Sequence, residues 1–178
     1  MRIKNAVAAV RISIMKALIE LFEFAAPTYD ATYILSHLEK KFSNCDTLKL
    51  KVMIAEFVKF MYLRSQYNKG FIPLKGDIDD IWHEFILQTM EYEKFCQALP
   101  SGKFIHHNSL HLEEFSLGKE KKEVVRDLLM WLPNYYRHFG EFTEENAEYW
   151  MIVGFLQKER KLSLEEINQI AKKAHDYH

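Results

Sequence analysis

Residues that interrupt helices are rare in this chain. Only 6 glycines and 4 prolines are spread over 178 residues, so long stretches run without the breaks that a sheet with many turns requires. Within those stretches apolar residues recur every three or four positions, which is the period of a helix with one buried face. The sequence therefore predicts an all-α protein: a single-domain irregular helical bundle of about seven helices, formed by residues 1–178.

Capping residues indicate where several of these helices begin. Asp30 precedes a segment in which Ile34, Leu38 and Phe42 share one face, and Asp46 precedes the apolar segment 47–67. Further helices are expected at 118–132 before Pro133, at 144–159 after Thr143, and from a Ser163–Glu166 capping box to the C-terminal end.

Composition excludes some classes of function. The 24 basic and 25 acidic side chains leave a formal charge of -1, so no nucleic-acid partner is expected, because phosphate contacts require a strong basic field. Apolar residues make up 48% of the chain, which is enough for a packed core. The two cysteines are too few for a disulfide framework and favour a reducing, cytoplasmic location.

The first 22 residues begin basic and continue apolar, as a targeting segment does. Arg11 and Lys16 interrupt the apolar run, so neither a signal peptide nor a membrane-spanning helix is predicted. Ile12, Met15, Ile19 and Phe22 instead lie along one side of an amphipathic helix. Packing against the core is the preferred interpretation of this stripe, and contact with a membrane surface is the alternative.

Residues 77–107 contain the side chains that are the strongest candidates for a functional site. Asp79 and His83 are four positions apart and therefore share a helix face. His106 and His107 follow in a loop that could fold back onto that face. Together the four side chains could bind a metal ion. Alternatively, Asp79 could hydrogen-bond to the His83 imidazole and orient it without contacting the ion itself.

Cys96 joins such a site only under a condition. It lies 13 residues after His83, which is about 20 Å along an unbroken helix. A bend within 87–92, where Thr89 lowers helix propensity and could cap a new helix, would permit a shared site, and a straight helix would forbid it. Otherwise Cys96 is a small buried hydrophobic residue, as Trp82 is expected to be a core residue.

The same residues could instead form a nucleophilic catalytic site. Cys96 could pair with His106 or His107, with Asp79 or Asp80 orienting the imidazole. A reactive thiol must be exposed and have a low pKa. The aromatic neighbours of Cys96 indicate burial instead, and this hypothesis ranks last.

Residues 77–107 also carry a resemblance to a known family. They are similar to bacterial uncharacterised proteins related to the plant glycine-rich domain-containing protein-like family, with D-x-x-W-H, T-x-x-Y-x-x-F-C and a His pair in that order. Phe85 stands where the plant-like members have a second histidine. The matching positions are Asp79, Trp82, His83, Thr89, Tyr92, Phe95, Cys96, His106 and His107.

The resemblance extends over about 48–150, and residues 1–45 and 163–178 are expected to be additions to that core. It implies no established activity, but the recurrence of His, Cys and His-His in one motif favours a metal site. A structural zinc site formed by Asp79, His83, Cys96, His106 and His107 is the first hypothesis. A metal-free protein-interaction module, in which these residues form an internal hydrogen-bond network, is the second. A thiol- or metal-dependent enzyme is the third.

An aromatic group near the end of the 118–132 segment has two interpretations. Trp131, Tyr135 and Tyr136 could form an exposed patch that contacts an unknown protein partner. Burial in the core is the preferred interpretation, because large aromatic side chains more often fill the interior.

Overall fold

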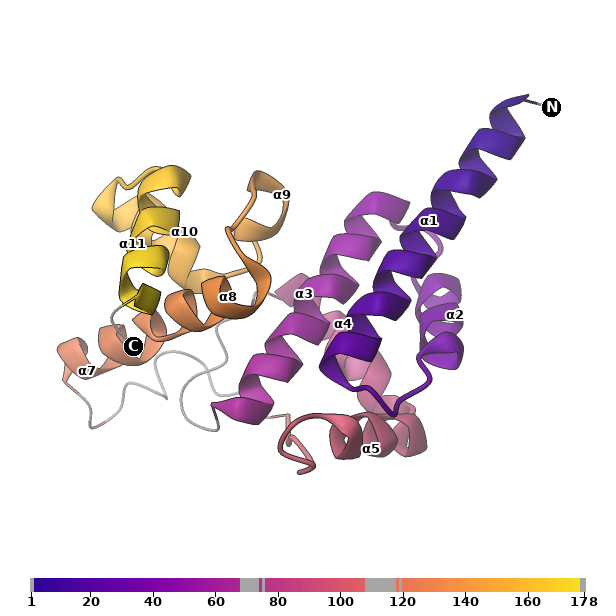
Figure 1. Cartoon of the computed structure of the whole chain (residues 1–178), viewed down its shortest axis with the longest axis horizontal. Helices are drawn as coiled ribbons and strands as arrows, with labels where there is room; N and C mark the ends of the chain where they lie inside the picture. Colours follow the sequence, from indigo (N-terminus) through magenta and orange to yellow (C-terminus); the bar gives the residue numbers. More distant parts are fainter. Residues whose placement is uncertain (1, 68–73, 75, 108–117, 119, 177–178) are drawn as a thin grey trace. The chain divides into compact units, whose positions relative to one another are not determined.

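The structure is a computed structural model that describes residues 2–67, 74, 76–107, 118 and 120–176. These residues form helices and no strand; the only β-type pairing recorded among them is an isolated bridge between Leu74 and Trp150. The all-α prediction is therefore confirmed (Figure 1).

Backbone contacts divide the chain into two compact units. The first consists of Met1–Gln66 with Asp77–Ile105, and the second of Tyr67–Gly76 with His106–His178. Each unit is described separately below. The prediction that 1–178 form one domain stays a prediction.

The first unit is a group of helices around an aromatic core. Phe22, Phe57, Phe85 and Phe95 are fully buried in it, and the Phe85 and Phe95 rings stack with centroids 5.3 Å apart. The long helices α1 and α3 pack against each other. The helices of this unit are α1 (Arg2–Ala25), α2 (Thr32–Lys41), α3 (Thr47–Gln66), α4 (Gly76–Leu87) and α5 (Thr89–Ala98).

The face that α1 buries is displaced from the predicted stripe. Ile14, Leu18 and Phe22 are buried, whereas Ile12 is 69% exposed. Phe22 was predicted correctly and Ile12 was not, because two apolar stripes lie side by side on this helix and periodicity alone does not choose between them. No helix in the described part of the chain combines the length and apolar character needed to cross a bilayer.

One prediction for the first unit is confirmed, and one condition that the sequence left open is met. The Asp46 carboxylate accepts hydrogen bonds from the backbone N–H groups of Leu48 and Lys49, at 3.0 and 2.9 Å, and so caps α3. The bend between His83 and Cys96 is also present, since α4 ends at Leu87 and α5 begins at Thr89. Gln88 between them has φ -86° and ψ 61°, which is not a helical conformation.

The second unit is built around α8, which packs against both α7 and α11. Its core is aromatic, with the Tyr135 and Phe142 rings stacked at 4.1 Å and Trp131 and Trp150 buried beside them. Burial of Trp131 and Tyr135 bears out their preferred assignment to the core. The helices of this unit are α7 (Lys121–Leu129), α8 (Trp131–Phe139), α9 (Glu144–Ala147), α10 (Met151–Arg160) and α11 (Leu164–Asp176).

The predicted cap at Thr143 and the predicted Ser163–Glu166 capping box are both confirmed; Thr143 also forms a capping box, through reciprocal hydrogen bonds with Asn146. Two helix boundaries differ from the prediction. The predicted 118–132 helix ends at Leu129, and Pro133 lies in the first turn of α8, where its missing N–H is harmless. The predicted 144–159 helix is interrupted before Trp150, whose backbone forms the bridge with Leu74.

Candidate functional site

Helix α4 positions the first two candidate ligands. Asp79 and His83 are one turn apart, and His83 Nδ1 lies 3.3 Å from Asp79 Oδ2. Their side chains are 42% and 53% exposed, while Ile81, Trp82 and Phe85 on the same helix are buried. The amphipathic pattern of α4 thus puts the apolar side chains into the core and leaves this pair at the surface, as the four-residue spacing predicted.

His107 completes a group of three. Each of Asp79, His83 and His107 offers one ligand atom, and these three atoms all lie within 4.8 Å of one another. His107 is the second residue after Ile105, and two residues of chain span at most about 7 Å. The anchoring of Ile105 therefore limits where the His107 side chain can lie.

Ile105 is held by a buried chain of hydrogen bonds. The Trp82 indole N–H donates to the Tyr92 hydroxyl at 2.9 Å, and that hydroxyl donates to the Ile105 carbonyl at 2.5 Å. Trp82 and Tyr92 are at most 1% exposed, so these bonds are shielded from water. This chain ties the start of the 105–107 segment to both α4 and α5.

Cys96 belongs to this buried region and not to the group of three. It is fully buried, and burial raises the pKa of its thiol, although hydrogen bonds with the Ile105 backbone and Tyr92 act in the opposite direction. Among the described residues, the ligand group comprises Asp79, His83 and His107, and neither Cys96 nor the exposed His106 is in it. Residues 108–111, the rest of the predicted loop, lie outside the described residues.

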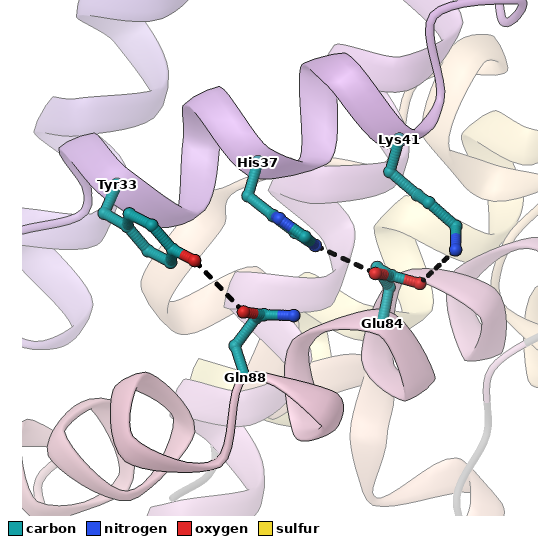
Figure 2. A network of polar contacts seen from close by, with 5 residues as sticks. All are labelled: Tyr33, His37, Lys41, Glu84 and Gln88. Atoms are coloured by element: carbon teal, nitrogen blue, oxygen red, sulfur yellow. Dashed lines mark hydrogen bonds and ion pairs between the residues drawn. The ribbon is translucent and has the colours of Figure 1, made fainter.

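A second polar cluster joins α2 to α4 (Figure 2). The Glu84 carboxylate lies 2.8 Å from His37 Nε2 and 3.0 Å from Lys41 Nζ. Hydrogen bonds from His37 and then Lys41 lower the pKa of Glu84. Gln88 lies one turn after Glu84, directly after the end of α4. Its side chain accepts a hydrogen bond from the Tyr33 hydroxyl at 3.1 Å.

Sequence reasoning missed this cluster. Glu84 is only 9% exposed, although glutamate side chains usually lie on the solvated face of a helix. No second polar residue stands at a diagnostic spacing from His37, so the sequence alone indicates no partner for it. Its partner lies 47 residues away, and only the packing of α2 on α4 brings the two together.

The donor types in the group of three define what it can do chemically. Two imidazole nitrogens and one carboxylate oxygen suit divalent transition metals such as zinc or iron. A set of three protein ligands also leaves at least one coordination position open, in contrast to the four ligands of a closed structural zinc site. The geometry supplies a place for one ion at the surface of α4.

Comparison with known proteins matches the chain to a family. A family model described as UCP032817-like matches residues 16–133. This range contains α4, α5 and all the candidate ligands, but not α10 or α11. No curated protein matches the chain, and no solved structure does.

Proposed function

The chain belongs to the UCP032817-like family, and from that premise and the residues of α4 we propose that it binds one divalent transition metal ion, zinc by preference, through Asp79, His83 and His107. The observation that carries the proposal is the mutual approach of their three ligand atoms within 4.8 Å. Cys96 and His106 are not needed as ligands in this arrangement, and water would fill the remaining coordination.

The proposed role of the ion is to stabilise the fold, with water in the coordination position that the three protein ligands leave open. It would connect α4 to the chain that follows Ile105, at a point where Tyr92 already holds the Ile105 carbonyl. Binding energy of the metal would then add to the stability of this segment, because the ligands are brought together only in the folded chain. A reducing, cytoplasmic setting belongs to the same proposal and is supported by two free cysteines.

We also infer a relationship between this family and the plant glycine-rich domain-containing protein-like family. The inference depends on the motif that runs from Asp79 to His107, which includes the buried Trp82 and Tyr92 as well as the proposed ligands.

Metal content of the purified chain tests the proposal. Protein prepared without chelator should contain about one equivalent of metal by elemental analysis, and His83→Ala and His107→Ala should each lose most of it. His106→Ala is the matched control, because His106 is the exposed neighbour of His107 and lies outside the ligand group. Absence of metal from the wild-type chain, also after dialysis against zinc, would contradict the proposal, as would equal loss in the His106 variant.

A metal-free interaction module is the second candidate, and one observation favours it. The Trp82–Tyr92–Ile105 hydrogen bonds hold the start of the segment with protein groups alone. A melting temperature that does not change on addition of chelator would favour this candidate, whereas a chelator-sensitive one supports the metal. The thiol-dependent enzyme has no such support, since the Cys96 thiol is buried and its pKa is raised.

A further inference from the structure

The second unit has an apolar groove that the proposed function does not use. The groove has a volume of about 930 Å³ and is lined by residues of α7, α8, α10 and α11. Val125 and Leu129 come from α7, Leu132 and Pro133 from α8, and Ile170 from α11. All of these helices belong to the second unit, and α8 packs against both α7 and α11.

Among the residues that the structure describes, the groove is open on one side. Met130 and Ile170, both lining residues, are 54% and 41% exposed. Large apolar side chains exposed together around a concave surface are typical of binding sites. Methionine at such an edge adapts its shape to different apolar partners.

Basic side chains at the groove have no carboxylate partner within the part of the chain that is described. Lys122, Arg126 and Arg160 line the groove, and no ion pair is recorded for them there. The two acidic lining residues, Glu120 and Glu123, are both used in the capping box of α7. Their carboxylates are thus held at the N-terminus of α7, and with three basic and two acidic lining residues an occupant would meet a small excess of positive charge beside an apolar surface.

These features favour one kind of occupant. An alkyl chain is apolar on all sides, so a half-open groove would leave much of it in water. An amphipathic helix is apolar on one face only, and its other face remains solvated when it lies in a groove between helices. Carboxylates beside its apolar stripe would meet Arg126 and Arg160, and guanidinium groups bind carboxylates in a bidentate geometry.

We propose that the groove between α7 and α11 docks an acidic amphipathic helix of a partner protein. Leucine-type side chains at the i, i+3 or i+4, and i+7 positions of that helix would enter the groove. Its glutamates would lie against Arg126 and Arg160. The proposed metal group contributes no residue to this groove, so the two proposals stand independently.

A pair of designed peptides tests the proposal on the full chain. Both are three- to four-turn amphipathic helices with the same leucine stripe, one with glutamate and the other with lysine on the flanks. Fluorescence anisotropy should show that the acidic peptide binds at least about tenfold more tightly than the basic one. Its affinity should fall as salt is raised, because pairs at the rim of a groove are screened.

Variants of the protein locate the site. Arg126→Glu with Arg160→Glu should weaken binding of the acidic peptide at least tenfold and strengthen that of the basic peptide. Met130→Gln should weaken both through the apolar contact. Lys172→Glu is the matched control, since Lys172 is an exposed residue of α11 that does not line the groove, and it should leave binding unchanged. All these positions are exposed, and circular dichroism checks that each variant keeps its helix content.

Three results would overturn the proposal. The first is equal binding of both peptides, or no effect of the arginine reversals. The second is displacement of the acidic peptide by a monomeric fatty carboxylate of similar affinity, which would identify an amphiphile site. The third is a dimer of the chain that the arginine reversals dissociate, which would identify a second copy as the occupant.

Discussion

Trp82 and Tyr92 are joined by a buried hydrogen bond of 2.9 Å, from the indole N–H of α4 to the phenol oxygen of α5. The bond exists because the chain changes direction at Gln88, which brings a residue of α5 back against α4. The same Tyr92 hydroxyl donates to the Ile105 carbonyl. One side chain therefore connects two helices and the segment that leads to His107.

Tyr92→Phe is expected to destabilise the fold by about 1–3 kcal/mol. The substitution leaves the Trp82 N–H and the Ile105 carbonyl buried without their partner, and an unsatisfied buried polar group carries a desolvation cost of this order. Urea unfolding followed by circular dichroism measures the difference. Tyr33→Phe is the control, because the Tyr33 hydroxyl bonds to Gln88 in an exposed position, and its effect should stay below about 0.5 kcal/mol. Equal losses in the two variants would contradict the role assigned to Tyr92.

Cys96 is expected to resist alkylation in the native protein. A thiol reacts through its thiolate, and burial both raises the pKa of Cys96 and blocks the reagent. Cys45, which is partly exposed, provides an internal control in the same sample. Iodoacetamide labelling followed by mass spectrometry should modify Cys45 at least tenfold faster at neutral pH. Rapid labelling of Cys96 without unfolding would restore the nucleophile hypothesis.

The sequence predicted those features that depend on neighbours along the chain. The Asp46 cap, the Ser163–Glu166 capping box and the shared face of Asp79 and His83 are all set within four residues, where spacing fixes geometry. The bend within 87–92 was left open by the sequence, because the low helix propensity of Thr89 permits a bend but does not require one; the structure has it at Gln88.

Features that depend on packing between helices could not be predicted from residue spacing along the chain. The partner of His37 is 47 residues away on α4, so no spacing rule links it to Glu84. On α1, the choice between the stripes of Ile12 and Ile14 was decided by the surface of α3 and its neighbours. Tertiary contacts select among faces that a single helix offers equally.

Asn168 is expected to be important for the stability of the second unit. Its side-chain amide accepts a hydrogen bond from the Phe142 N–H at 2.8 Å and donates one to the Phe142 carbonyl at 2.9 Å. Asn168 is 7% exposed and Phe142 is 2% exposed, so Asn168→Ala would leave both backbone groups of Phe142 unsatisfied. A loss of about 2–4 kcal/mol is expected by urea unfolding, as two buried groups lose their partner.

Gln169→Ala is the control for that measurement. Gln169 is the exposed neighbour of Asn168 on the same helix, and alanine is the better helix former. This variant should match or slightly exceed the wild-type stability. A similar loss in both variants would show that the cost lies in α11 itself and not in the contact with Phe142.

Glu84→Gln is expected to lower the free energy of unfolding at neutral pH. It should also make that free energy depend less on pH in the acidic range. Hydrogen bonds from His37 and Lys41 lower the pKa of Glu84 in the folded state. A carboxyl whose pKa is lowered by folding stabilises the fold above its unfolded pKa, and that contribution is lost as pH falls through the folded pKa. Glutamine keeps the size of the side chain but cannot carry the charge that attracts His37 and Lys41. The expected loss of unfolding free energy at pH 7 is about 1.5–3 kcal/mol, typical of hydrogen bonds to a charged group. The difference from wild type in unfolding free energy should narrow as pH falls below the ordinary carboxyl range near 4.

Urea unfolding at several pH values measures this difference. Glu93→Gln is the control, since the exposed Glu93 carboxylate accepts a long hydrogen bond of 3.4 Å from Gln97. A difference that stays constant from pH 7 to pH 3 would show that the charge of Glu84 contributes nothing and that only its shape matters.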